Sequence, residues 1–366
     1  MSLKSVLIIL AVLIIVCVSL FVSIIFIELI RAKRAKNRSS DIRNIKPILH
    51  KLLTEETFDF FKNNTKNISK LGVKLKGKTS FQVLEDMLLD VLEDSGSETK
   101  ARARAIAYYF GFPDKCLSMI RNRLPVNITI GCRKAGIYQL ENAIFDILKA
   151  LDIISGETQY QALMALARIG DTVAMIRAFD KIYRHILVNE RAITEILNTF
   201  SGDRYELFKT MLHHRSHYIV RLFLKDIDKE NAKALINDII SICEDGSKEA
   251  RLAGVVAIGR IGDDKNIPIL VKALSDKIWE IRAVAAKTLG VLTGPAALIP
   301  LANAAHDSEW WVRQNAVTSI LAYPHYEETL ISIVKTGDRY AHDAILYSLE
   351  KAGKTKLLAR IGRVTR

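Results

Sequence analysis

The stretch DDKNIPILVKALSDKIWEIRAVAAKTLG, at residues 263–290, contains one complete unit of a repeating pattern. Its first half has Pro268 near the start of an apolar run with helical periodicity, where the missing backbone N–H costs least. Asp276 interrupts that run, and its side chain can cap the first turn of a following helix. The second half places Ile281 on the apolar face of a helix that we expect to end at Gly290. The stretch therefore predicts two short amphipathic helices.

Arginines recur along the chain at a nearly constant spacing. Successive members lie 30, 30, 31 and 31 residues apart, and they are Arg191, Arg221, Arg251, Arg282 and Arg313. Six residues before each of the last three stands an aspartate, and these are Asp245, Asp276 and Asp307. The sequences ALARIGD and AIGRIGD lie 92 residues apart, which is close to three repeat lengths. Self-similarity at such a period is typical of an array of helical repeats.

A pair of short amphipathic helices cannot bury its apolar faces alone. Stacking of successive pairs buries them continuously, which gives a superhelical array. We therefore expect residues 80–366 to form an all-α solenoid of two-helix repeats. Residues 327–351 keep the helical periodicity but lack an arginine at the repeat position, as a terminal cap would.

This pattern resembles the HEAT-repeat family, which has an armadillo-type fold. In that family a proline in the first helix, an aspartate at the turn and an apolar–arginine pair in the second helix recur at fixed offsets. Pro268, Asp276 and Arg282 match that pattern in full. The short form of the repeat is similar to that of bacterial HEAT proteins and of the phycobilin lyases.

The resemblance implies a ladder of stacked aspartate–arginine pairs, and the sequence departs from it in the middle of the array. Repeats with Arg191 and Arg221 have His185 and Arg215 where the aspartate should stand. The ladder should therefore be incomplete there. The resemblance also implies a groove that binds other proteins.

Residues 5–27 contain no charged side chain and are mostly leucine, isoleucine, valine and phenylalanine. As a helix this stretch would span about 35 Å, enough to cross a hydrocarbon core of about 30 Å. A cleaved signal peptide has a shorter apolar core followed by small residues, whereas this stretch runs into a basic cluster. We predict that residues 1–30 form a single transmembrane anchor.

Basic side chains are unequally distributed about this anchor. Lys4 precedes it, and five follow it, namely Arg31, Lys33, Arg34, Lys36 and Arg38. Positive charge resists translocation, so we expect the N-terminus outside and the C-terminal domain in the cytoplasm. The five side chains can also attract anionic lipid headgroups, by about 1 kcal/mol each. The alternative is that they only fix the topology.

Between the anchor and the repeats we expect less regular structure. Residues 31–46 are predicted to be a basic juxtamembrane linker, and residues 47–79 a first helix followed by a loop. A second irregular loop is expected at Val126–Ile130, which Pro125 and Gly131 enclose.

Composition excludes several classes of protein. The net charge of +13 owes five units to the basic cluster, which leaves a mildly basic body. The cysteines are widely spaced, without a pair or a histidine cluster, and they are Cys17, Cys116, Cys132 and Cys243. This usage argues against a disulfide framework or structural zinc, and it fits a reducing compartment.

No arrangement typical of catalysis stands out, and we predict no enzyme, no cofactor and no metal. Iron hydroxylases with HEAT-like repeats use His–Glu pairs, but none of the eight histidines here precedes a glutamate. His213 and His217 could share a helix face, yet a metal site needs further ligands. The resemblance to phycobilin lyases leaves a lyase-like enzyme as an alternative, although nothing marks a pigment site.

Trp310 and Trp311 open the second helix of their repeat. Neighbouring residues point about 100° apart on a helix, so one tryptophan is a candidate partner contact. The alternative is that both pack between repeats.

The function predicted from these features is a membrane-anchored cytoplasmic scaffold. Its groove would bind a membrane-associated partner protein, such as a membrane glycosyltransferase or another envelope-assembly enzyme. A nucleic-acid-binding HEAT-like protein is the alternative, which the lack of a dense Lys/Arg stripe disfavours.

Overall fold

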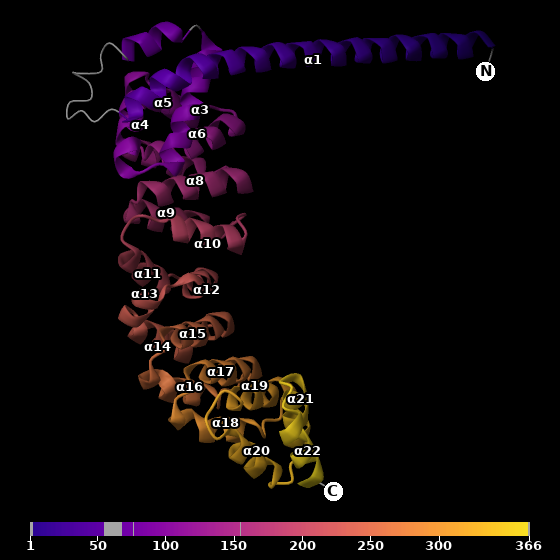
Figure 1. Cartoon of the computed structure of the whole chain (residues 1–366), viewed down its shortest axis with the longest axis vertical. Coiled ribbons are helices and arrows are strands. Elements are labelled where there is room, and N and C mark those ends of the chain that lie inside the picture. Colours follow the sequence, from indigo (N-terminus) through magenta and orange to yellow (C-terminus); the bar gives the residue numbers. More distant parts are fainter. Residues whose placement is uncertain (1–2, 55–67, 76, 154, 365–366) are drawn as a thin grey trace. The chain divides into compact units, whose positions relative to one another are not determined.

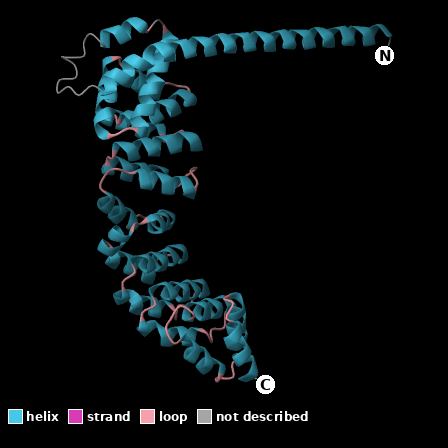
Figure 2. Ribbon diagram, in the orientation of Figure 1, coloured by secondary structure: helices cyan, strands magenta, loops and turns pink. Residues whose placement is uncertain are grey.

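The computed structural model describes residues 3–54, 68–75, 77–153 and 155–364, except for the side chains of residues 3–15 and 362–364. Within these residues every regular element is a helix and no strand occurs (Figure 2). The expectation of an all-helical chain is therefore confirmed. The chain divides into two compact units, Met1–Asp146 and Ile147–Arg366, whose helices are labelled in Figure 1.

The first unit begins with one uninterrupted helix, α1 (Leu3–Thr54) (Figure 1). The helix includes all of residues 31–46, so the prediction of a linker there was wrong. Ile45, Leu49 and Leu52 are buried near its end, where α1 packs on α3 and α4. This burial outweighs the low helix propensity of the serine- and asparagine-containing stretch that precedes it.

Residues 47–79 differ from the prediction of a helix followed by a loop. Residues 47–54 complete α1, and residues 55–67 lie outside the described part of the chain. Residues 68–74, which were expected in the loop, are helical. Ile68 and Leu71 are buried there, and their burial favours the helix over the loop that the local Asn/Lys/Gly composition suggested.

The remaining helices of the first unit are short and follow one another closely. They are α3 (Lys78–Asp94), α4 (Ser97–Tyr109), α5 (Phe112–Ile120), α6 (Pro125–Tyr138) and the 3₁₀ turn η1 (Glu141–Ala143). Helix α7 (Ile144–Ala150) crosses the boundary into the second unit.

Helix α6 replaces the irregular loop expected at Val126–Ile130, so that prediction was wrong too. Pro125 is its first residue, a position where proline is compatible with a helix. Gly131 faces α5 so closely that a Cβ atom would lie 2.7 Å from Cγ1 of Ile120. The glycine therefore permits close packing of two helices, although it had been interpreted as the end of a loop.

A buried carboxylate holds three helices of the first unit together. Glu85 of α3 is 1% exposed. Its carboxylate lies 3.1 Å from Nζ of Lys115 on α5 and 2.6 Å from Nζ of Lys134 on α6. A charge at this depth needs such partners, since desolvation without them would be costly.

The first half of α1 bears apolar side chains that no other element covers. The exposed large ones among the described residues are Val16, Val18, Leu20, Phe21, Val22, Ile24, Ile25, Phe26, Ile27 and Leu29. Over the residues that the structure describes, no helix has a stretch of sufficient length and hydropathy to span a bilayer. The predicted anchor also includes residues 5–15, whose side chains lie outside the description. The anchor thus stays a prediction.

The second unit alternates two kinds of helix along the chain. The first helices of the pairs are α9 (Thr172–Ile182), α11 (Arg204–Leu212), α13 (Lys229–Ala234) with α14 (Ile236–Asp245), α16 (Ile267–Ala273), α18 (Leu298–Ala304), α20 (Tyr326–Val334) and α22 (Thr355–Val364). The second helices are α8 (Gly156–Ile169), α10 (Glu190–Thr199), α12 (His217–Asp226), α15 (Lys248–Ile261), α17 (Trp279–Leu292), α19 (Trp310–Ile320) and α21 (Arg339–Lys351). The 3₁₀ turns η2 (Asp264–Asn266) and η3 (Pro295–Ala297) precede α16 and α18.

The repeat at residues 263–290 forms η2, α16 and α17. Pro268 lies in the first turn of α16, and Ile281 of α17 is buried, as predicted. Helix α17 does not end at Gly290 but continues to Leu292, and Thr293 caps it in the left-handed conformation with φ 52°. Gly290 has a packing role instead.

Consecutive second helices lie side by side, and small residues bring them together. Helix α15 contacts α17, which in turn contacts α19. A Cβ atom at Gly259 would lie 2.3 Å from Cγ2 of Thr288, and one at Gly290 would lie 2.9 Å from Cα of Ser319. The close approach lets Ser319 donate a hydrogen bond of 2.9 Å to the carbonyl of Ala286.

Candidate functional site

The aspartate–arginine pattern of the sequence corresponds to contacts between successive repeats. Arg251 is the fourth residue of α15, and its guanidinium forms an ion pair with Asp276 of the next repeat. Asp276 also accepts a hydrogen bond of 2.8 Å from the backbone N–H of Ile278, just before α17. One carboxylate therefore shapes the turn of its own repeat and binds the repeat before it.

The next pair repeats this geometry. Arg282 is the fourth residue of α17, and its Nε and Nη2 lie 2.7 and 2.8 Å from the two carboxylate oxygens of Asp307. Its Nη1 donates to the carbonyl of Asp276 at 2.9 Å. Burial is the largest effect and acts to raise the pKa of Asp307, but the hydrogen bonds and charge of Arg282 and the backbone N–H of Glu309 together lower it below its ordinary value.

Arg191, Arg221 and Asp245 do not take part in such pairs. Arg191 is the second residue of α10 and is exposed, and Arg221 is the fifth residue of α12. Asp245 ends α14 and lines an open cleft with Arg251. Relative to the fourth position that Arg251 and Arg282 occupy, Arg221 lies one residue later in its helix and Arg191 two residues earlier, so a nearly constant period alone did not place them.

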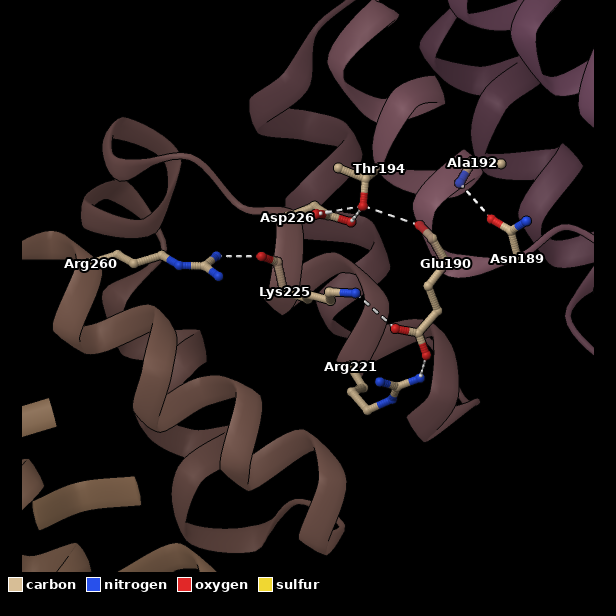
Figure 3. A network of polar contacts seen from close by, with 8 residues as sticks. All are labelled: Asn189, Glu190, Ala192, Thr194, Arg221, Lys225, Asp226 and Arg260. Carbon is tan, nitrogen blue, oxygen red and sulfur yellow. Dashed lines mark hydrogen bonds and ion pairs between the residues drawn. The ribbon is translucent and has the colours of Figure 1, made fainter. Parts of the chain in front are cut away.

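A different network occupies the middle of the array (Figure 3). Glu190 receives hydrogen bonds from Arg221 and, at 2.8 Å, from Lys225. The hydrogen bonds from Arg221 and Lys225 lower the pKa of Glu190 to about 2. The hydroxyl of Thr194 donates to Asp226 at 2.9 Å. These contacts join α10 to α12 without an aspartate at the turn.

Arg313 occupies the fourth position of α19 but differs from Arg251 and Arg282. It is 7% exposed, and Nη1 donates to the carbonyls of Asp307 and Ser308 at 2.7 and 2.8 Å. Its Nε is buried without a hydrogen-bond partner. Among the described residues it has no carboxylate within ion-pair distance, so its charge is uncompensated there.

The carboxylate expected beside Arg313 binds another side chain. Asp338 follows Asp307 by 31 residues, and it caps α21 by accepting from the backbone N–H of Tyr340 at 2.9 Å. Its second oxygen lies 2.7 Å from Nδ1 of His306. The hydrogen bond from His306 lowers the pKa of Asp338.

Aromatic side chains surround Arg313 and reach the surface. The guanidinium carbon lies 5.9 Å from the ring centre of Trp310 and 5.3 Å from that of Tyr340. Trp310 packs edge-on against Tyr347, with ring centres 5.5 Å apart. Trp311 is 58% exposed. We call Trp310, Trp311, Tyr340 and Tyr347 the aromatic surface.

A second candidate site lies in the first unit, between α1 and α3. This cleft has a volume of about 600 Å³. Its lining consists of Arg31, Arg34, Ala35, Arg38, Lys78, Thr79, Gln82, Val83 and Asp86. We call it the basic cleft. Of the five cations in the basic cluster, Lys33 and Lys36 do not line it.

The histidines considered as metal ligands lie apart from other ligands. Nε2 of His213 is 3.1 Å from Oδ1 of Asp238, and His217 begins α12. Within the part of the chain that the structure describes, no three potential metal ligands come together.

A comparison with known families found one match, which lies in the second unit. The stretch from α14 to the end of α19, residues 236–322, matches the family of HEAT repeats. This part of the chain is therefore similar to HEAT repeats. The match includes the pairs Arg251–Asp276 and Arg282–Asp307, as well as Arg313.

The solved structures that resemble this chain are distant from it. YibA of Escherichia coli is 15% identical, with a TM-score of 0.32, over 75% of this chain and 98% of that protein. Human deoxyhypusine hydroxylase in complex with glycerol is 14% identical, with a TM-score of 0.28, over 78% of this chain and 100% of that enzyme. No curated protein matches the sequence.

Sequence reasoning missed two residues outside the stretch that matches HEAT repeats, Asp338 and Glu190. Extending the 31-residue spacing by one step from Asp307 would have found Asp338. Glu190 gave no such signal, because its role depends on Arg221 and Lys225 reaching it from another helix.

Proposed function

We propose that this chain is a membrane-anchored scaffold whose aromatic surface binds an acidic segment of a partner protein. The observation that carries the proposal is the exposed cluster around Arg313. Exposed tryptophan and tyrosine beside arginine are the side chains that contribute most to protein binding.

Of the two tryptophans, Trp311 is the candidate partner contact, since Trp310 packs against the next repeat. Trp310 is partly covered by Tyr347, whereas Trp311 extends into solvent. Tyr340 and Tyr347 are also exposed. Large exposed aromatic side chains form a surface that a partner can desolvate at a small entropic cost.

The charge of Arg313 determines the chemistry of the partner. Arg251 and Arg282 each face an aspartate, and Arg313 does not. Arg313 is 7% exposed, so a glutamate or aspartate of a bound segment would bring its negative charge close to this guanidinium at the edge of the aromatic surface. Charge-assisted bonds to a guanidinium are stronger than neutral ones, so an acidic segment fits better than an apolar one.

The anchor is proposed from the sequence of α1. Twenty-three consecutive residues lack charge, and the described ones in this stretch expose their apolar side chains. The excess of basic residues after this stretch orients the C-terminal domain toward the cytoplasm. Tethering raises the effective concentration of any partner in the same membrane. A membrane glycosyltransferase or another envelope-assembly enzyme is such a partner.

Crosslinking from Trp311 tests the binding surface. A photoreactive amino acid at position 311 should capture a protein in native membranes, and Trp311→Ala should lower co-purification of that protein about tenfold. Tyr205→Ala, an exposed aromatic on α11, is the matched control and should leave the yield unchanged. Equal loss in both variants would contradict the proposal, as would salt-sensitive DNA binding that depends on Trp311.

Cys17 provides a test of the anchor. Burial raises the pKa of Cys116, Cys132 and Cys243 to about 12, so these thiols react little at neutral pH. Cys17 is the exposed cysteine. A membrane-impermeant maleimide should leave it unlabelled in intact membranes and label it after denaturation in dodecyl sulfate. Strong labelling in intact membranes would show that α1 is not embedded.

A further inference from the structure

We infer that the basic cleft binds the phosphate group of a membrane lipid. This inference rests on the proposed anchor, because the cleft begins four residues after the uncharged stretch ends at Ile27. At 1.5 Å per residue, Arg31 lies about 6 Å and Arg34 about 10 Å beyond that point. The headgroup layer on each side of a bilayer is about 5–7 Å thick. Arg31, at the mouth of the cleft, therefore lies at the depth of lipid headgroups, and Arg34 lies just beyond their outer edge.

The lining of the cleft suits an anion. Four cations, Arg31, Arg34, Arg38 and Lys78, face one carboxylate, Asp86. Arg34 and Lys78 have no hydrogen-bond or ion-pair partner within the described residues. Two more donors, Thr79 and Gln82, complete the polar lining. Guanidinium groups bind phosphate through paired hydrogen bonds, and an ammonium adds a point charge.

The other two arginines are available because their present partners are weak. Arg31 lies 2.9 Å from Glu28, and both side chains are exposed. Arg38 lies 3.0 Å from Asp86, in a pair that is also open to solvent. Exposed pairs of this kind contribute less than about 1 kcal/mol, so a phosphate can replace either carboxylate.

The size of the cleft and the conformation of α3 agree with this ligand. A volume of about 600 Å³ lies within the usual range for small-ligand sites. Lys78 and Thr79 lie in the first turn of α3. This first turn contains no acidic residue, and no side chain caps the start of the helix. A helix start of this kind favours a nearby negative charge, which adds to the effect of the four cations.

The basic cluster itself supplies a control. Lys33 and Lys36 lie on the same helix as Arg34 and carry the same charge, but they do not line the cleft. Attraction of a polybasic segment to an anionic surface would depend on all five cations alike. A built site depends on Arg34 and Lys78 and not on Lys33 and Lys36.

Titration of the full chain in neutral detergent tests this difference. The probe is dioctanoyl phosphatidylglycerol, and its Kd is measured by calorimetry. Arg34→Gln with Lys78→Gln should raise the Kd about tenfold, since two charge-assisted contacts are lost. Lys33→Gln with Lys36→Gln should change it less than twofold. Asp86→Asn should lower the Kd, because Arg38 is then free to bind the phosphate.

Three outcomes would overturn the inference. Equal losses in the two double variants would reduce the effect to surface attraction. Equal affinity for dioctanoyl phosphatidylcholine would show that the cations do not select an anion. Inorganic phosphate that binds as tightly as the lipid would assign the site to a soluble anion. The titration needs no bilayer, so its failure is distinct from a failure of the anchor, which Cys17 labelling reports. Thermal melting verifies that each variant is folded.

Discussion

Arg282 and Arg191 belong to the same series of arginines in the sequence, but they differ in burial and in pairing. Arg282 binds Asp307 through two nitrogens in a mostly buried pair, whereas Arg191 is exposed on the second position of α10. An arginine of this series therefore joins two repeats through an aspartate in one case, and in the other it makes no such pair.

Replacing each arginine by alanine should separate these roles. Arg282→Ala leaves Asp307 without its partner and should lower the free energy of unfolding by about 1–3 kcal/mol. Arg191→Ala should change it by less than about 0.5 kcal/mol. Urea unfolding followed by circular dichroism measures both. Equal effects would contradict the assignment of the ladder.

Glu190 should give the middle of the array a distinct response to acid. Its pKa is lowered to about 2 by Arg221 and Lys225, from an ordinary value of 4.5. A lowered pKa contributes stability above pH 4.5, which is lost as the pH falls toward 2. The melting temperature of the wild type should therefore exceed that of Glu190→Gln at neutral pH, and the difference should shrink below pH 4.5. A constant difference down to pH 2 would argue against the ion pairs.

At the scale of elements, the contacts between second helices depend on glycine. At Gly290 of α17 an added methyl group would meet the backbone of Ser319 on α19, which cannot move like a flexible side chain. Neighbouring helices would have to separate, with loss of the Ser319–Ala286 hydrogen bond.

Gly290→Ala should therefore destabilise the second unit by about 1–3 kcal/mol, despite the higher helix propensity of alanine. Gly72→Ala is the control, because Gly72 is helical and its nearest neighbour would be 4.0 Å away. That change should be neutral or stabilising by up to about 1 kcal/mol. Chemical unfolding of both variants decides the matter, and a stable Gly290→Ala protein would disprove the close packing.

Sequence reasoning succeeded where short-range patterns control structure. The repeat at residues 263–290 was predictable because its turn aspartate, its proline and its apolar spacing all act within one pair of helices. Sequence reasoning failed in the first unit, where contacts between residues far apart in the sequence determine which segments are helical. Residues 31–46 and 126–130 have weak local helix signals, and packing around Ile45 and Gly131 makes them helical.

The candidate sites were only partly predictable for the same reason. Trp310 and Trp311 attract notice in the sequence, but the tyrosines beside them come from α21. The basic cluster was also visible, yet only packing of α3 on α1 divides it into residues that line the cleft and residues that do not.

At the scale of the whole molecule, the two units combine different kinds of side chain. The first contributes an apolar helix and a cluster of cations, and the second contributes aromatic rings around one arginine. The proposed scaffold uses both sets, the first for lipid and the second for a partner protein.

Asp276 and Asp307 each make contacts in two repeats, so the unfolding of one repeat is coupled to the unfolding of the repeat before it. When one repeat opens, its aspartate is withdrawn from the arginine behind it, and that repeat loses a restraint at the same moment. Disorder that starts near α19 would thus spread backward through α17 to α15 as a single event. The helices α10 and α12 have no part in this chain of aspartates, because Glu190 joins them through a separate set of contacts.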